Sequence, residues 1–422
     1  MSSGKEPLTK APETAVRTLG DKGFPLIREY GIYLFLLLMF GGKFGTFREL
    51  GLYLPSFLWL LQGIIRKKFG VAWREPLLIG ILGLSLSAVL STFLSTTPFH
   101  ALFLLKREYL KIILLYCVIS ATFAHREKLK QLAFFIALVG ILYLSVGLFR
   151  IVGDLLKAGF INYGETRYYA TVFLFFLPFF LLQNISAEGL KRVLWTLPLM
   201  GSMAGILLIG VRGSWLALFG IVCIWIYFLK EKSGAVFVVL KRGVPVILVA
   251  MAIVFILFPG QLKMIKEHTV QKVQMSLRFE TWNIFLIMAK DRFLIGHGID
   301  DGAMMDQFRE EFKRVRGEYP AEGIQPTTPH NQFIKILYQQ GIVGLMLYCA
   351  LFIVLIHRTV KTFRMHREGS PLFIGIAVLS AILGEYVIRC LTEDRSLIPL
   401  GFLLGMAGAY LNPMKEPSGE KI

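Results

Sequence analysis

Charged residues are scarce in this sequence: Asp, Glu, Lys and Arg make up 18% of its 422 residues, whereas hydrophobic residues make up 55%. The mean hydropathy is +0.61. A set of water-soluble domains is excluded, because a soluble fold of this length cannot hide so much apolar surface. Lipid must solvate much of the chain, which predicts an integral membrane protein.

Cysteine is also rare, and its placement excludes further classes of site. The four cysteines stand singly inside apolar segments, without the Cys-x-x-Cys spacing of zinc or redox sites, and we interpret them as small buried side chains: Cys117, Cys223, Cys349 and Cys390. The sequence lacks a glycine-rich nucleotide loop and an Asp-x-Asp element as well. No cofactor and no metal site are therefore expected.

Long apolar runs are abundant instead. A membrane-spanning helix needs roughly 20 mostly apolar residues, and it satisfies its own backbone hydrogen bonds inside lipid. The sequence therefore predicts an all-α polytopic membrane protein with about twelve transmembrane helices. The predicted helices cover residues 27–45, 51–65, 76–94, 109–124, 129–149, 168–182, 193–210, 214–229, 244–258, 333–356, 372–388 and 397–411.

The basic residues orient these helices. If the tail 1–26 is cytoplasmic, the cytoplasmic segments, including the C-terminal tail 412–422, carry 24 of the 46 Lys and Arg residues. The short outer loops and helix edges carry 12, and the large loop 259–329 between helices nine and ten carries 10. This positive-inside asymmetry places the large loop in the periplasm, between the helices of 27–258 and those of 330–411. No basic run is interleaved with aromatic residues, so no nucleic-acid partner is expected.

The large loop is predicted to be partly helical. One helix begins near Ser276, a good N-cap residue, and its apolar character suggests that it lies in the membrane interface. A second helix over 300–316 is amphipathic, with Met304, Phe308 and Phe312 on one face. A loop of this length with its own structure usually serves as a lid or a binding surface.

His330 follows this loop at the start of the tenth predicted helix. Thr328 is expected to cap that helix, with Pro329 at its first position and His330 in its first turn. The positive end of the helix dipole disfavours imidazolium there, so we expect a neutral imidazole, as a general base requires. The alternative is an interfacial histidine that only caps the helix or packs on the loop.

Two arginines lie near hydrocarbon on the same side. Arg212 stands in the turn between predicted helices seven and eight, and Arg278 on the first loop helix. Such an arginine is costly unless it snorkels to the interface or binds an anion, and its planar fork suits phosphate. An interface anchor and a phosphate ligand are both open interpretations. Weaker candidates, more often anchors or ion pairs than ligands, are Arg167, Lys106, Arg107, Arg389 and Asp394.

Three sequence elements occur in order on this outer side. They are VRGSW at 211–215, RFETW at 278–282 with GHGID at 296–300, and PHNQFIKILYQQGIVGL at 329–345. In these elements, and in its twelve predicted spans and long outer loop, the chain resembles the O-antigen ligase family. That family stands within a wider group that also holds O-antigen polymerases and protein O-oligosaccharyltransferases. Val211 occupies a position where Ser is common in the family.

The resemblance implies a metal-independent inverting glycosyltransferase of the bacterial inner membrane, with its active site facing the periplasm. The donor would be a glycan on undecaprenyl diphosphate and the acceptor a hydroxyl of lipid A-core, in lipopolysaccharide biosynthesis. By this likeness Arg212 and Arg278 would hold the diphosphate, and His330 would take the proton of the acceptor. The expected partners are these two glycolipids and membrane lipids.

Two alternatives stay open. Within the group, the chain can be an O-antigen or exopolysaccharide polymerase or a protein O-oligosaccharyltransferase, because acceptor choice lies in pocket shape. In another class, it can be a lipid or solute transporter. Transporters usually place ionisable groups at mid-membrane, whereas the predicted spans here are nearly free of acids, with Glu385 the main exception.

Overall fold

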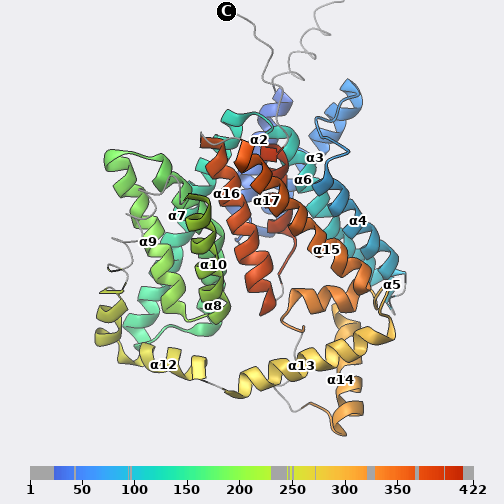
Figure 1. The fold of residues 1–422 in the computed structure, drawn as a ribbon, viewed down its shortest axis with the longest axis vertical. Helices are drawn as coiled ribbons and strands as arrows, with labels where there is room; N and C mark the ends of the chain where they lie inside the picture. Colours follow the sequence, from blue (N-terminus) through green and yellow to red (C-terminus); the bar gives the residue numbers. More distant parts are fainter. Residues whose placement is uncertain are drawn as a thin grey trace, which may run out of the picture.

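The computed structural model describes residues 23–411, except 42–43, 94, 96, 230–244, 246–247, 250, 271, 321–327, 366–369 and 394. All regular elements assigned in these residues are helical (Figure 1). The α-helices are α2 Phe24–Leu38, α3 Gly45–Arg66, α4 Pro76–Thr92, α5 Pro98–Leu105, α6 Lys111–Thr122, α7 Arg126–Ala158, α8 Tyr163–Ser186, α9 Gly189–Ile209, α10 Arg212–Leu229, α12 Pro259–Val270, α13 Lys272–Asp291, α14 Asp301–Arg316, α15 Gln332–Met365, α16 Ser370–Ile382 and α17 Ile398–Leu411. The short elements are π-helical η3 Lys106–Leu110 and η4 Leu383–Ile388, and the 3-10 turn η5 Arg389–Leu391.

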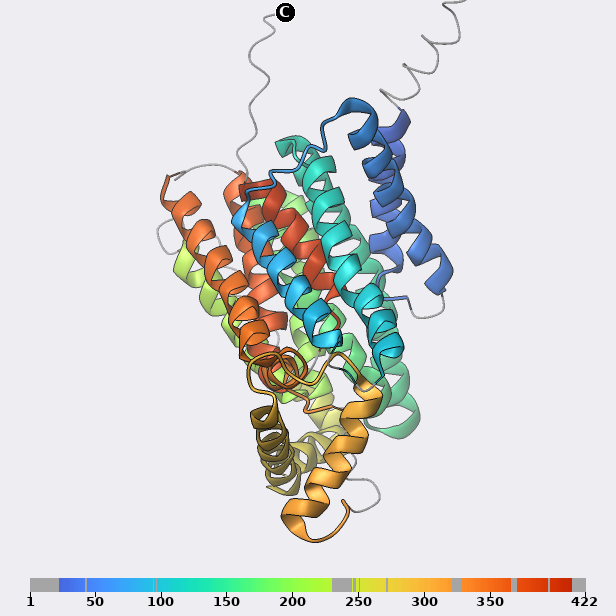
Figure 2. The same cartoon turned by 90° about the vertical axis from the view of Figure 1, so that its right-hand side faces the viewer.

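The helices form a bundle with two distinct ends. Most of them run roughly side by side, whereas α12 and α13 lie across one end, which we name the loop end (Figure 1). After a quarter turn, α14 is seen to project beyond the bundle at this same end (Figure 2). The first described helix, α2, begins at the opposite end, and α17 ends there.

Five helical segments are long and apolar enough to cross a membrane: Arg126–Ala158, Thr166–Ser186, Gly189–Ile209, Gln332–Arg364 and Phe373–Leu391. Shorter apolar helices accompany them at Pro76–Thr92, Arg212–Phe228 and Ile398–Leu411. The predicted all-α polytopic membrane fold is confirmed at this level. The number of twelve spans stays a prediction, in part because the predicted helix 244–258 lies partly outside the described residues.

The surface of the bundle also fits contact with lipid. On α7, large apolar side chains at steps of three or four residues are exposed: Phe134, Leu138, Leu142, Val146 and Phe149. These spacings place them along one side of a helix. A soluble protein would cover such a stripe, so its exposure indicates that lipid covers it.

Several helix ends differ from the sequence prediction. The second predicted helix, 51–65, is longer in the structure, where α3 includes Pro55 in its interior. The Pro55 ring packs closely on Gly31 of α2, where an added Cβ would overlap the ring. The sixth predicted helix, 168–182, begins five residues earlier as α8, because the side chain of Asn162 caps it.

The large loop is partly helical, as predicted. Its first predicted helix starts at Lys272 rather than Ser276. Its second is α14, and Asp300 caps it by accepting hydrogen bonds from two backbone N–H groups at 2.9 and 3.1 Å. The predicted apolar face of α14 is buried against α13 and α15, in a small core whose members include Phe285, Phe308 and Tyr338. This core fastens the loop helices to the beginning of α15.

A break at Gly341 divides α15 into a short helix, 332–340, and the long spanning part. Gly341 has φ +66° and ψ −168°, a conformation that glycine adopts far more readily than other residues. An added Cβ there would overlap the carbonyl group of Leu294. The prediction of one continuous helix over 333–356 is therefore wrong at this point. The short helix turns away from the direction of the long part (Figure 1).

The segment that follows α13 satisfies the backbone groups freed by this break. Ile342 N donates to Phe293 O at 2.8 Å, and Gly298 N donates to Gln339 O at 3.0 Å. Gly298 belongs to the GHGID element, and an added Cβ on it would lie 2.7 Å from the side chain of Ser95. The element thus supports the helix that immediately follows His330.

Candidate active site

His330 lies just outside α15, not in its first turn as predicted. Asn331 is the actual cap, because its Oδ1 accepts hydrogen bonds from Phe333 N at 3.0 Å and Ile334 N at 3.2 Å. His330 has φ +49°, which is incompatible with a helical residue. The hydroxyl of Thr328 contacts this histidine instead of the helix: it accepts from His330 N at 3.4 Å and lies 3.5 Å from Nδ1.

The short segment around His330 is held from two sides. Trp282 of α13 donates from its indole Nε1 to Pro329 O at 2.8 Å. Asn331 Nδ2 donates to Leu391 O at 3.1 Å, which fixes the segment to the chain after η4. The residues before and after His330 are therefore anchored, so the imidazole is carried by a constrained backbone.

Arg278 lies one helical turn before Trp282 on α13. Its Nη1 donates to Thr392 O at 3.3 Å, and the residue is partly buried. Arg278 thus contacts the same short stretch of chain, 391–392, that accepts the hydrogen bond of Asn331. The structure brings Arg278 and the His330 segment to one place, although 52 positions separate them in the sequence.

Arg212 approaches this place from α10, of which it is the first residue. The turn before it uses Gly210, which has φ +78°. The next residue, Gly213, packs so closely on the loop that an added Cβ would collide with the hydroxyl of Thr392 and lie 3.7 Å from Arg389 Cγ. All three elements that the sequence singled out therefore meet around Thr392.

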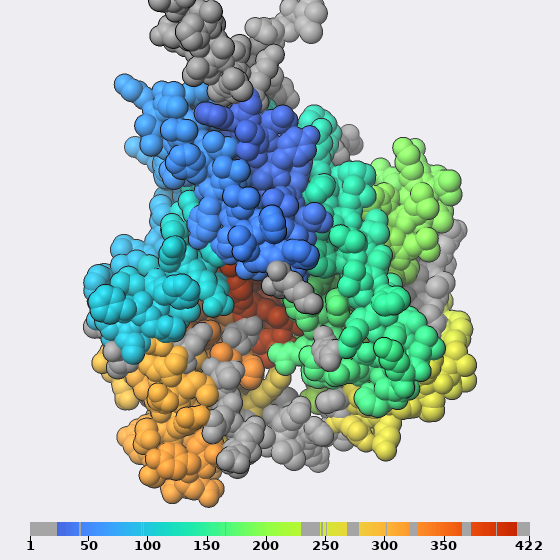
Figure 3. Space-filling view, turned by 180° about the vertical axis from the view of Figure 1, so that it is seen from behind, coloured from blue at the N-terminus to red at the C-terminus, as the bar shows by residue number. Residues whose placement is uncertain are grey.

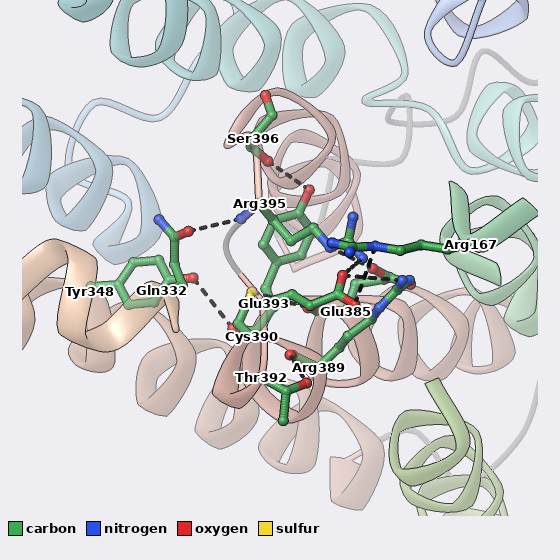
Figure 4. A network of polar contacts seen from close by, with 11 residues as sticks. Arg167, Gln332, Tyr348, Glu385, Arg389, Cys390, Thr392, Glu393, Arg395 and Ser396 are labelled. Atoms are coloured by element: carbon green, nitrogen blue, oxygen red, sulfur yellow. Dashed lines mark hydrogen bonds and ion pairs between the residues drawn. The ribbon is translucent and has the colours of Figure 1, made fainter. Parts of the chain in front are cut away.

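Behind Thr392 lies a buried cluster of charges that we name the arginine–glutamate network: Glu385, Arg389, Glu393 and Arg395 (Figure 4). The Arg389 side chain is 0% exposed and lies 3.3 Å from each of Glu385 and Glu393. Arg395 pairs with Glu393, and its backbone N donates to Gln332 Oε1 at 2.9 Å. The network therefore fixes the turn that contacts Arg278, Gly213 and Asn331.

The pKa of the Glu393 carboxyl reflects the arginines around it. Burial favours its neutral form, yet Arg389, Arg395, Arg167 and Arg278 together hold the pKa of its carboxyl below the ordinary value. The Arg167 guanidinium lies 4.0 Å from Glu393. Because α8 starts earlier than predicted, Arg167 lies inside this helix rather than before it.

The other candidate residues from the sequence analysis do not lie together in the structure. Arg389 is buried and pairs with Glu385 and Glu393. Lys106 and Arg107 stand in η3, beside a separate groove. Asp394 lies outside the described residues. Within the described part of the chain, no three His, Cys, Asp or Glu side chains are grouped as a metal site.

A cavity of about 430 Å³ adjoins the network, and we name it the inner cavity. Its polar wall includes Glu385 and Arg395, and its apolar wall includes Phe40, Phe175 and Ile398. Seen from behind, the molecule is hollowed between its N-terminal helices and α8, with the C-terminal segment at the base (Figure 3). An amphipathic molecule can thus lie beside the converging cations.

Thr392 and Gln332 were not predicted as site residues, yet they hold the site together through a carbonyl group and a side-chain amide. The clustered charges of Glu393 and Arg395 between two apolar segments were a usable signal, because such charges rarely enter membrane helices unpaired. Their pairing partners, however, depend on the fold.

Comparison with protein-family models gives a match to part of the chain. Residues 195–349 match the family model described as O-antigen ligase. A comparison with curated proteins gave no match. The matched range contains Arg212, Arg278 and His330, whereas the arginine–glutamate network lies after it. This domain is shared by O-antigen ligases, O-antigen polymerases and O-oligosaccharyltransferases, which are glycan-transferring enzymes acting on lipid-linked glycans. Residues 195–349 of this multi-pass membrane protein are therefore an O-antigen ligase family domain.

Proposed function

We propose that this protein is an O-antigen ligase. It transfers a glycan from undecaprenyl diphosphate to a hydroxyl group of lipid A-core at the periplasmic face of the inner membrane. The observation that carries this proposal is the meeting of Arg278, the Arg212 turn and the His330 segment around Thr392. Cations for a diphosphate and a base for a hydroxyl stand within one site.

Arg212 and Arg278 bind the diphosphate of the donor. A guanidinium carries five N–H donors in a planar fork, which matches phosphate oxygens two at a time. Arg278 directs one nitrogen to a backbone carbonyl group, which orients the fork. These charges stabilise the negative charge that develops on the leaving diphosphate.

His330 acts as the general base. The acceptor oxygen attacks the anomeric carbon and forms the new glycosidic bond, while the bond from that carbon to the diphosphate oxygen breaks. The acceptor proton passes to the imidazole, and undecaprenyl diphosphate leaves with both bonding electrons. Attack from the face opposite the leaving group inverts the configuration at the anomeric carbon.

The proposed orientation rests on the charge distribution along the chain. The loop end carries the proposed site, and the segments assigned to the other side hold 24 of the 46 Lys and Arg residues. By the positive-inside rule the loop end faces the periplasm. Lipid-linked donor and acceptor then reach the site from the membrane plane, with the inner cavity at its side.

Reconstitution tests this proposal. The purified protein is supplied with a lipid-linked glycan and, separately, with rough lipopolysaccharide, a second donor molecule or a pilin. A covalent glycan on rough lipopolysaccharide is the expected product. Extension of the donor would instead identify a polymerase, and a glycosylated pilin a protein transferase. Movement of lipid across the bilayer without any covalent product would identify a transporter.

A further inference from the structure

A second polar cavity, of about 480 Å³, opens near the inner cavity. Residues of α3, of the continuous stretch from α5 through η3 into α6, and of the segment before α17 line it. We name it the basic groove, because its charged lining consists of Arg48, Lys106, Arg107 and Lys111 against Glu49 and Glu108. Four cations against two carboxylates give it a net charge of +2.

Both carboxylates are engaged in holding the groove together. Glu49 accepts a hydrogen bond from Lys111 Nζ at 2.7 Å. Glu108 accepts hydrogen bonds from Ser396 Oγ at 2.9 Å and from Leu397 N at 2.8 Å, which fastens η3 to the segment before α17. Lys106 and Arg107 are exposed, and Arg107 lies 3.9 Å from Glu108. The excess positive charge is therefore presented at the open side.

The backbone of η3 helps to gather these cations. In a π-helical turn the backbone hydrogen bonds join residues five apart rather than four, so residues five apart come closer to one face. Lys106 and Lys111 are such a pair, and both line the groove. Isolated π-helical turns are frequent at functional sites.

The groove also adjoins the inner cavity beside the candidate active site. Arg48, Ser396 and Ile398 line both the basic groove and the inner cavity, and the inner cavity reaches Arg395 of the arginine–glutamate network. The exposed ring of Phe103 forms part of the groove wall, at 60% exposure. An occupant of the basic groove therefore meets cations and apolar surface next to the inner cavity.

We propose that the basic groove binds a phosphate group of the membrane-anchored glycolipid acceptor. This inference rests on the proposed function, in which Arg212 and Arg278 already take the diphosphate of the donor. A separate cation set, in a groove that shares three lining residues with the inner cavity, then serves the other substrate. Lys106 and Arg107 contact the phosphate and select acceptors that carry it.

Direct binding measures this selectivity without any turnover. The full-length protein, in nanodiscs of neutral lipid and without donor, is titrated with rough lipopolysaccharide and with the same material after chemical removal of its phosphates. The wild type is expected to bind the phosphorylated form about 10-fold or more tightly, the scale of losing charge-assisted hydrogen bonds. The double variant Lys106→Gln with Arg107→Gln is expected to bind both forms alike.

A matched control removes two exposed lysines from α12 at the same end, Lys263→Gln with Lys266→Gln. This control should keep the wild-type preference. Equal binding of the two forms by the wild type would overturn the proposal, whether or not the double variant folds. An equal loss of preference in the control would overturn it as well, because the effect would then be general surface charge.

Competition with phosphatidylglycerol distinguishes a phosphate of the acceptor from the phosphate of a membrane phospholipid. If phosphatidylglycerol in the nanodiscs abolishes the preference through Lys106 and Arg107 at low mole fraction, the groove is a site for membrane phospholipid, and the acceptor assignment is wrong. Preference that persists in phosphatidylglycerol supports the assignment. Because the readout is binding, an inactive protein in the transfer assay would defeat the proposed function and still leave this result readable.

Discussion

At the scale of single residues, the site depends on a histidine in an unfavourable backbone conformation. Positive φ is uncommon outside glycine, although Asn, Asp and His adopt it more often than other residues. His330 is one of two described residues other than glycine with this conformation. The hydrogen bonds of Trp282 to Pro329 and of Asn331 to Leu391 maintain it on either side. Such strain is often stored where a side chain must point in one direction.

Replacing the general base or a diphosphate-binding arginine should slow transfer strongly without unfolding the protein. We expect His330→Ala and Arg278→Ala each to lower the transfer rate by roughly 100-fold or more, the usual cost of losing a general base or an electrostatic clamp. The measurement is glycan transfer by purified protein whose melting temperature is unchanged.

His357→Ala is the control for histidine removal, because His357 is exposed on the spanning part of α15. It should retain full activity. Wild-type activity in the His330 or the Arg278 variant would remove that residue from the mechanism.

Glu393 gives a pH-dependent contribution to stability. Its pKa is lowered from the ordinary 4.5, so the ionised carboxylate is favoured in the folded state. The stabilisation is therefore complete above the ordinary pKa and is lost as the pH falls through the lowered value. Glu393→Gln should cost about 3 kcal/mol at pH 7, because it leaves buried arginines less compensated.

The corresponding measurement is the melting temperature of both proteins from pH 7.5 downwards. The gap between them should be widest at neutral pH and should narrow below pH 4.5. A gap that stays constant over this range would show that the charge of Glu393 does not contribute.

At the scale of elements, the break in α15 decides where His330 lies. The short helix 332–340 is fixed by Gly341 on one side and by the Asn331 cap on the other. The backbone of 293–298 fills the gap that the break leaves. One glycine thus orients a whole helix with respect to α13, which carries Arg278.

Gly341→Ala should therefore disturb both stability and activity. The new Cβ would overlap the Leu294 carbonyl at a positive φ, so we expect a loss of about 2 kcal/mol or more, with a large loss of transfer. Gly153→Ala on α7 is the control, since nothing lies within 4 Å of the added Cβ. It should be neutral or slightly stabilising. Equal behaviour of the two variants would contradict the role of the break.

Much of this element-level structure follows from sequence, and the remainder does not for identifiable reasons. Apolar length predicts the long spans, and the spacing of Met304, Phe308 and Phe312 predicts the buried face of α14. Helix starts depend on which of several polar residues caps: Thr328 and Asn331 both qualify by type, and only tertiary contacts select Asn331. The break at Gly341 is not evident from sequence, because a single glycine is tolerated within a helix and only the close contact with Leu294 reveals its role.

The candidate active site was likewise predicted only in part from the sequence. Arg212, Arg278 and His330 were recognisable as unusual residues near apolar segments, and their convergence could be expected only through the family resemblance. The burial of Arg389 between Glu385 and Glu393 was not predicted, since a charged run after an apolar segment usually lies at the interface. Long-range pairing, which brings residue 392 to residue 278, is a property of the fold.

At the scale of the whole molecule, the orientation in the membrane decides whether the proposed active site lies on the periplasmic side. We expect a cysteine at position 263 on α12 to react with a membrane-impermeant maleimide in intact spheroplasts. A cysteine at Glu127, at the start of α7, should react only after lysis. Both changes are made in a Cys223→Ser background, because Cys223 is exposed. The reverse pattern would place the loop end in the cytoplasm and contradict the positive-inside assignment.

The most direct test of the central claim is a cryo-electron microscopy structure of the protein with undecaprenyl diphosphate. We predict that the diphosphate lies at the loop end, within hydrogen-bonding distance of the guanidinium groups of Arg212 and Arg278, with the imidazole of His330 facing the position of the transferred sugar. A diphosphate bound elsewhere, or contacting neither arginine, would contradict the account.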